Sequence, residues 1–373
     1  MTHTESETDK MKNTDFNPIR LKSSRLYRAK TIDQLAKETN INKKDILAFE
    51  ESKYLPTSEN AIKMSKALKF PIEYFYQKDN MKVLVENTHF AVPGSIPRVE
   101  EVAYREKLVM TQKIYSLMEN HISLPKLNLP EKINKNASIE ELANQVRRYW
   151  GLNDEAIDNL AEIMEKNGII ISEINTGKRG SASFTQKQSI DGELRYIVAL
   201  GDDDKSSPKR NYDLAYELGY IISNKLGIPT KKFSKDEFAC AFLLPKENFL
   251  IDLKSPEDLN SYIELKRTWI VPISIMIFRA HQLGILSYKK YNHLAREMEK
   301  QGWLRQEPLE GSMEAENPKL LRNIPSKLKE SNLMNSDIVE LLSNFGISLN
   351  KEDIDILLGL RSETLQSKPR KKR

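Results

Sequence analysis

Residues 211–220 read Asn-Tyr-Asp-Leu-Ala-Tyr-Glu-Leu-Gly-Tyr and have the spacing of a metal-binding catalytic helix, without its ligands. Tyr216 and Tyr220 are four positions apart, so a helix places both on one face, with Glu217 beside the first. Zinc peptidase helices of the H-E-x-x-H type use this spacing for two imidazoles and a water-activating glutamate. A phenol, with a pKa of about 10, is neutral at neutral pH and binds zinc poorly.

Other side chains do not supply the missing ligands. The histidines of the chain are His3, His89, His121, His281 and His293. None lies between residues 121 and 281, the span that contains the tyrosine pair. Cys240 lies between two alanines and is interpreted as buried packing. The sequence therefore predicts no metal and no cofactor, with Tyr216 and Tyr220 either packed in the core, the favoured interpretation, or lining a remodelled pocket.

A second stretch, residues 31–50, has the pattern of two short helices joined by a tight turn. Thr31 precedes Gln34 by three positions, which predicts a capping box at the start of the first helix. Asn40 tolerates the left-handed backbone of a tight turn, and Asn42 is the expected cap of the second helix. Two helices in this arrangement fit the major groove of DNA.

The second of these helices has one apolar and one basic side. Ile46 and Phe49 are expected to face inward, and Lys43, Lys44 and Leu47 to face outward. A polar, basic start to the outward side is what a helix that reads bases requires. The alternative is a small helical bundle used for dimerisation or protein contact, and the sequence favours DNA binding over it.

The distribution of charge along the chain says more about function than the net charge does. The net charge is +5, but five of the last six residues are Lys or Arg. Residues 17–69, by contrast, hold 12 Lys and Arg against 6 Asp and Glu. A clustered basic excess indicates a phosphate-binding face. With 39% hydrophobic residues and one cysteine, a soluble cytoplasmic protein of two or three domains, without a membrane partner, is expected.

The helix-turn-helix stretch resembles the XRE (Cro/C1-type) family over about sixty residues. The matching motifs are TIDQLA, NIN, DILAFE and SENAIKMSKALKFPIEYFY. The resemblance implies that the helix from Asn42 reads bases and the one from Thr31 braces the backbone. The residues implied to lie nearest DNA are Thr31, Asn42, Lys43, Lys44 and Ala48. The family often has Gln where this chain has Ile32, which puts one phosphate contact in doubt.

A longer part, residues 138–308, resembles the ImmA/IrrE metallopeptidase family. The motifs are NYDLAYELGY, FACAFLLP and the segment from Leu265 to Pro308. The resemblance implies that the ligand positions are Tyr216, Tyr220 and Ser234, all without a metal-binding side chain, and that only Glu217, the water-activating position, remains. It also implies that residues 181–184 form an edge strand beside the cleft.

The expected architecture is multidomain and mainly α. An all-α helix-turn-helix domain precedes an α+β zincin-like domain with a helical C-terminal extension. The expected segments are a disordered tail (1–16), the helix-turn-helix domain (17–80), a linker and connecting helix (81–136), the peptidase-fold domain (137–250), its helical extension (251–310), a C-terminal helical region (311–364) and a basic tail (365–373).

The function predicted from these features is transcriptional regulation, with repression favoured over activation. The protein is expected to bind operator DNA, an inverted repeat, as a homodimer. The peptidase-like domain, with no catalytic residues expected, would serve as a sensor for a small-molecule or protein effector, or as an assembly platform. The alternative is a metal-dependent endopeptidase of the ImmA/IrrE family that cleaves a repressor or an antitoxin.

Overall fold

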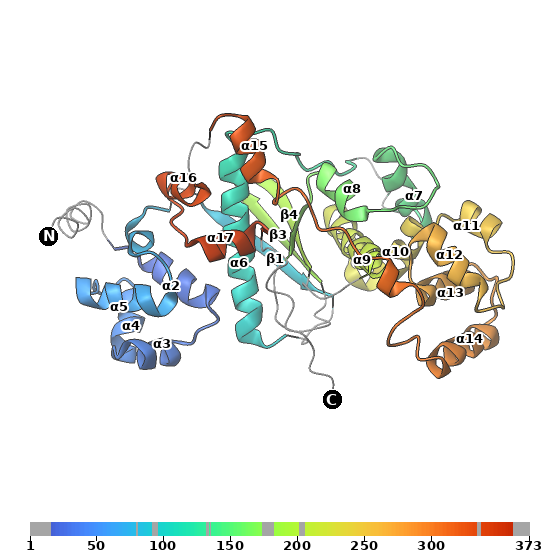
Figure 1. The fold of residues 1–373 in the computed structure, drawn as a ribbon, viewed down its shortest axis with the longest axis horizontal. Coiled ribbons are helices and arrows are strands. Elements are labelled where there is room, and N and C mark those ends of the chain that lie inside the picture. Colours follow the sequence, from blue (N-terminus) through green and yellow to red (C-terminus); the bar gives the residue numbers. More distant parts are fainter. Residues whose placement is uncertain are drawn as a thin grey trace.

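The computed structural model describes residues 16–79, 81–91, 96–131, 134, 136–173, 183–200, 206–333 and 337–360. The N-terminal helices lie at one end of an elongated molecule, a four-stranded sheet lies in the middle, and α11 to α14 lie at the other end (Figure 1). The last helices return along the sheet towards the N-terminal end. None of the helices in the described part of the chain has the length and apolar character needed to cross a membrane.

The N-terminal helices are short, and the α-helices among them begin at polar caps, as the sequence predicts at Thr31 and Asn42. They are α2 (Pro18–Tyr27), α3 (Ile32–Thr39), α4 (Lys43–Glu50), α5 (Ser58–Leu68) and the 3-10 helix η2 (Ile72–Tyr76). Thr31 and Gln34 form the predicted capping box, Asn40 has a φ of 53°, and Asn42 caps α4. Phe16 is 5% exposed and stacks on Phe75, so the predicted disordered tail does not include it. Residues 1–15 lie outside the described part.

The sheet contains a strand that was predicted to be linker. Its strands are β1 (Val83–Phe90), β2 (Ile170–Glu173), β3 (Phe184–Ile190) and β4 (Glu193–Leu200), in the order β1-β3-β4-β2. β1 pairs antiparallel with β3, β3 antiparallel with β4, and β2 parallel with β4. The linker assigned to residues 81–136 is therefore wrong for β1, which joins the sheet of the peptidase-like region. Of the edge strand expected at residues 181–184, residues 181 and 182 lie outside the described part, and Phe184 begins β3, which is an interior strand.

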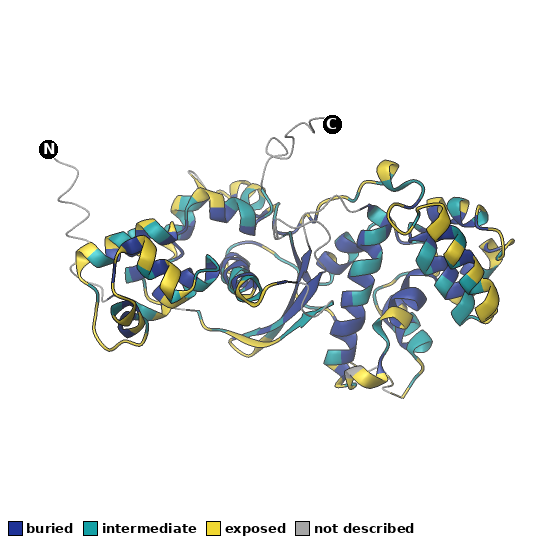
Figure 2. Ribbon diagram, turned by 90° about the horizontal axis from the view of Figure 1, so that it is seen from below, coloured by how far each residue is buried: buried dark blue, intermediate teal, exposed yellow. Residues whose placement is uncertain are grey.

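Both faces of the sheet are covered. α6 (Arg98–Glu119) and the C-terminal helices cover one face, and α9 (Ser207–Leu226) with α10 (Lys235–Leu243) covers the other. Ile170 and Ile197 belong to the first core, which lies under α6 and the C-terminal helices. Ile171 and Val198 belong to the second core, which lies under α9 and α10. A strand that is buried on both sides favours a continuous apolar run, as in β4 from Tyr196 to Leu200, whereas β3 buries Thr185, Gln186 and Gln188. Figure 2 shows the central sheet mostly buried and the exposed residues gathered on the outer helices.

The remaining helices extend the second core. They are α7 (Ile139–Tyr149), α8 (Leu160–Lys166), η3 (Thr230–Lys232), α11 (Lys246–Asp252), α12 (Ser261–Trp269), α13 (Ile273–Gln282), α14 (Tyr288–Lys300) and η4 (Glu310–Ser312). Tyr149, at the end of α7, is 48% exposed, and its hydroxyl donates to Asn128 Oδ1. Lys266 and Glu307 form a fully buried ion pair whose carboxylate also accepts from the first amides of α13, which joins α12 to the end of this region.

The C-terminal helices contact the helix-turn-helix domain. They are α15 (Ile324–Glu330), α16 (Ile338–Asn344) and α17 (Lys351–Leu357), all within residues 311–364, which were expected to be helical. Asp353 of α17 accepts from Arg28 Nη1 at 2.6 Å and from the Tyr27 hydroxyl at 3.3 Å. Asn350 donates to the carbonyl of Lys69 at 2.8 Å. The C-terminal region is therefore bound to the first domain rather than separate from it. The basic tail lies outside the described residues.

Candidate functional sites

The outward side of α4 presents polar side chains to solvent. Asn42, Lys43 and Lys44 are all exposed, and Leu47 beside them is 39% exposed. Asn42 Oδ1 accepts from the amide of Lys44 at 2.9 Å, which fixes the start of the helix. Lys43 pairs with Asp33 of α3 at 2.6 Å, but both side chains are more than half exposed, so the pair is weak and can rearrange.

Ala48 does not belong to this exposed surface. It is 6% exposed and lies on the inward side with Ile46 and Phe49, which are buried as predicted. The expectation that Ala48 lies nearest DNA is therefore wrong, because its methyl group is already covered by the domain. Thr31 is exposed at the start of α3, where its hydroxyl accepts from the amide of Gln34 at 3.2 Å.

Part of the basic excess in residues 17–69 is structural. Arg25 donates to both oxygens of Glu50 with both side chains nearly buried. Arg20 is buried and donates to the carbonyls of Tyr74, Lys78 and Gly346. Counting charges along the sequence therefore overstates the basic surface, since these side chains hold the domain together.

The second site is centred on Glu217, in the middle of α9. Its side chain is fully buried beneath β3, and each carboxylate oxygen accepts a hydroxyl hydrogen bond. Ser183 Oγ donates to Oε1 at 2.8 Å, and Thr185 Oγ1 donates to Oε2 at 2.6 Å. Burial raises the pKa of Glu217 from 4.5 to about 7, and the two hydroxyls oppose that rise. The buried site thus favours the protonated form of this carboxyl group more than water does.

Three rings and an ammonium group lie next to Glu217. His89 of β1 stacks on Tyr220, with centroids 4.2 Å apart, and more distantly on Tyr216, at 6.4 Å. Lys235 of α10 lies 4.9 Å from the centre of the Tyr216 ring and 3.1 Å from Nε2 of His89. Asn87, also of β1, donates to the Tyr220 hydroxyl at 3.0 Å. β1 therefore contributes two side chains to the α9 site.

The protonation states of His89, Lys235 and Tyr216 are consistent with the contacts among them. Burial, with a contribution from Lys235, lowers the pKa of His89 to about 4, so the ring is neutral at pH 7. The Lys235 ammonium can then donate to Nε2, which requires the ring proton to be on Nδ1. Burial lowers the pKa of Lys235, while Glu217 and Asp236 raise it. Burial also raises the pKa of Tyr216 to about 12, which keeps that phenol neutral.

The other implied ligand position has a structural role. Ser234 is the N-cap of α10, and its hydroxyl accepts from the amide of Glu237 at 3.1 Å. In α9, Gly219 allows α10 to approach closely, because a Cβ at this position would lie 3.1 Å from Cδ1 of Phe238. Within the described part of the chain, no three His, Cys, Asp or Glu side chains are grouped so that they could hold a metal ion.

Sequence reasoning missed His89 and Lys235. His89 was set aside because it lies before residue 121, in a segment read as linker, and only the pairing of β1 with β3 brings it to α9. Lys235 directly follows Ser234, an implied ligand position, so the resemblance could have placed it near residues 216 and 220. Cys240 is buried, as predicted.

Comparison with protein families matches two parts of the chain. Residues 19–80 match a helix-turn-helix domain, and residues 164–281 match the peptidase M78 family, described as an IrrE N-terminal-like domain. The predicted fusion of these two domains is confirmed. β1 and α6 lie between the matched segments, and α14 to α17 follow the second. No curated protein matches the chain closely enough to serve as a relative.

Proposed function

We propose that this protein is a sequence-specific DNA-binding regulator, acting as a repressor, whose IrrE-like domain works without a catalytic metal. The helix-turn-helix domain supports DNA binding. Asn42, Lys43 and Lys44, exposed at the start of α4, are the proposed base-reading residues, and Thr31 is a proposed backbone contact. The IrrE-like domain is proposed to sense an effector, either a small molecule or a protein, or to support assembly.

The observation that carries the metal-free proposal is the complete internal hydrogen bonding of Glu217. A glutamate that activates a metal-bound water must direct an oxygen at that water. Here both oxygens accept from Ser183 and Thr185 within a fully buried site. Together with the raised pKa, this supports a structural role for Glu217.

The residues around Glu217 also do not fit zinc. Tyr216 and Tyr220 offer neutral phenols, one stacked closely on His89 and the other beneath the Lys235 ammonium. Ser234 offers a hydroxyl that already caps α10. A cationic side chain in this position supplies positive charge beside Glu217 and repels a divalent cation. These features favour the regulator over the endopeptidase.

We further propose that the protein binds an inverted repeat as a homodimer. One helix-turn-helix unit contacts only a few base pairs. Two units on half-sites one helical turn apart, about 34 Å, give the specificity that one lacks. Sedimentation is expected to give a dimer on DNA, and a monomer both free and DNA-bound would contradict the proposal.

The decisive experiment compares the wild type with Glu217→Gln. Genome-wide mapping of bound sites supplies the operator, and a reporter under that operator gives the regulatory output. The purified wild type is expected to contain no stoichiometric zinc or manganese, and Glu217→Gln is expected to leave repression unchanged. Cleavage of a candidate repressor or antitoxin by the wild type, lost in Glu217→Gln, would establish the endopeptidase instead.

A further inference from the structure

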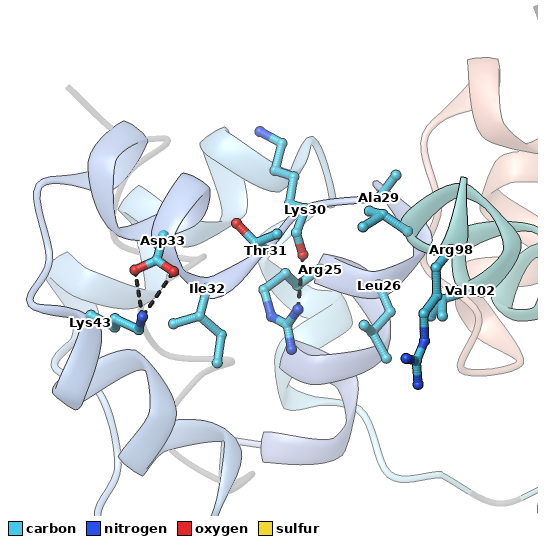
Figure 3. A pocket seen from close by; sticks show the side chains of 11 residues that line it. Arg25, Leu26, Ala29, Lys30, Thr31, Ile32, Asp33, Lys43, Arg98 and Val102 are labelled. Carbon is cyan, nitrogen blue, oxygen red and sulfur yellow. Dashed lines mark hydrogen bonds and ion pairs between the residues drawn. The ribbon is translucent and has the colours of Figure 1, made fainter. Parts of the chain in front are cut away.

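A hollow of about 420 Å³ opens between the helix-turn-helix domain and the start of α6. One side is formed by the end of α2, the start of α3 and Lys43 of α4, and the other side by Arg98, Val99 and Val102 of α6. Figure 3 shows Lys43 and Asp33 at one end of the hollow and Arg98 at the other, with Ile32 and Leu26 between them. The hollow therefore continues the surface on which Lys43 lies.

The hollow is lined by four basic side chains and one acidic side chain, Asp33, and the basic side chains differ in whether a carboxylate pairs with them. Arg25 is held by Glu50, Lys30 by Glu38, and Lys43 by Asp33. Arg98 also lines the hollow and is exposed, and it forms no ion pair with any residue that the structure describes. Among the described residues its guanidinium group is therefore available to an external anion without breaking an ion pair, whereas Lys43 must first leave Asp33.

The apolar side chains around Arg98 offer no hydrogen bond to such an anion. Ile32, Leu26, Val99 and Val102 contribute side chains without hydrogen-bonding groups. Ile32 stands at the start of α3, where the sequence left a backbone contact in doubt. A guanidinium group matches the geometry of a phosphate and can bind it through two parallel hydrogen bonds.

We propose that Arg98 binds a DNA backbone phosphate beside the bases read by α4, so that the DNA-binding face extends beyond the helix-turn-helix domain onto α6. This inference rests on the proposed DNA-binding function. Arg98 lies outside residues 19–80, which match the helix-turn-helix domain, and α6 packs directly against α2. Because α6 also covers the sheet, the same helix connects DNA to the IrrE-like domain.

A phosphate contact and a base contact have different signatures. Removing a phosphate contact weakens binding to all duplexes about equally and lowers the slope of log affinity against log salt by about 0.9. Removing a base contact mainly lowers the preference for the operator over random DNA. Arg98→Ala is therefore expected to weaken operator and random duplex alike, roughly 3- to 10-fold at moderate salt, and to lower the slope by about 0.9.

The experiment measures affinity of the full chain for the mapped operator and for a random-sequence duplex between about 50 and 200 mM salt. Arg98→Lys should retain the slope, since it keeps the charge. Arg296→Ala is the matched control: it removes one exposed arginine from α14, at the opposite end of the molecule, and should change neither quantity. Unchanged melting of Arg98→Ala would exclude a folding defect, since Arg98 is exposed.

Two failures are distinguishable. If the wild type binds neither duplex, the proposed function fails. If the wild type binds the operator while Arg98→Ala matches it in affinity and salt slope, Arg98 is not a DNA contact, although the function stands. A loss confined to the operator, with an unchanged slope, would also overturn the phosphate assignment.

Discussion

The start of α4 and the middle of α9 use polar side chains in opposite ways. Asn42, Lys43 and Lys44 direct their polar groups into solvent, with one weak ion pair between Lys43 and Asp33. Glu217 instead directs its carboxylate inward to two hydroxyls of the same chain. Exposed polar groups remain available to a partner, whereas satisfied buried groups mainly stabilise the fold. The difference indicates where this molecule is equipped to bind something else.

The largest expected effect comes from removing the exposed charges of α4. The double variant Lys43→Ala and Lys44→Ala should lower specific DNA affinity about 30-fold or more, taking roughly 1–3 kcal/mol for each contact. The fold should remain intact because both side chains are exposed. Gel-shift titration with the operator measures the effect.

The matched core variant on the same helix is Ile46→Ala, which should lower the free energy of unfolding by about 2–5 kcal/mol. Its folded fraction should still bind the operator with wild-type affinity. Unchanged affinity in the double lysine variant would place the base-reading surface elsewhere on the domain.

An intermediate effect is expected from rebuilding the ligand positions of α9. The triple variant Tyr216→His, Tyr220→His and Ser234→Glu should gain zinc binding, measured as bound metal after dialysis. Lys235 should oppose this gain, because its ammonium lies against the residue 216 ring. Adding Lys235→Ala to the triple variant should therefore tighten zinc binding.

Activity need not follow from zinc binding, since ligand orientation depends on further hydrogen bonds. If the triple variant binds no zinc with or without Lys235, the backbone of α9 and α10 does not hold the ligand frame, and the metal-loss interpretation loses its geometric basis.

The smallest expected effect concerns pH. Because the pKa of Glu217 is raised from 4.5 to about 7 by burial, its contribution to stability is fully present below about pH 4.5 and is lost as pH rises through 7. Glu165, whose pKa burial also raises to about 7, acts in the same direction. His89, with its pKa lowered from 6.5 to about 4, acts oppositely: its contribution is present above 6.5 and is lost towards 4.

Glu217→Gln should flatten this profile. Relative to the wild type, it is expected to gain stability between pH 4.5 and 8, on the order of 2–3 kcal/mol at most. Denaturant unfolding at a series of pH values measures the change. A parallel profile in the two proteins would show that Glu217 is ionised in the fold as it is in the unfolded chain.

The two regions also differ in how far the sequence predicts them. The helix-turn-helix region depends on local interactions, in which a side chain caps an amide or sets a backbone angle within a few residues. The effects of Thr31, Gln34, Asn40 and Asn42 can therefore be predicted from the sequence. β1 is different. None of its residues is fully buried, and it becomes a strand because residues about a hundred positions away in β3 pair with it.

The pairing of β1 with β3 also determines which side chains lie at the α9 site. The positions 216, 217, 220 and 234 could be named from spacing and resemblance, but His89 could not. Ala48 shows the reverse error, because its position in the motif suggested DNA contact while the packing of α4 on the domain buries it.

The bond between Arg28 and Asp353 joins residues 325 positions apart. During synthesis the helix-turn-helix domain leaves the ribosome first, while its partner in α17 does not yet exist. At about 5–20 residues per second, the interval between them is roughly 15–65 s. Throughout that interval Arg28 has no carboxylate from α17, and the carbonyl of Lys69 has no donor from Asn350. A nascent chain thus carries a DNA-binding domain that packs on α6, and the hydrogen bonds from α17 are added only once residues 350–353 have been made.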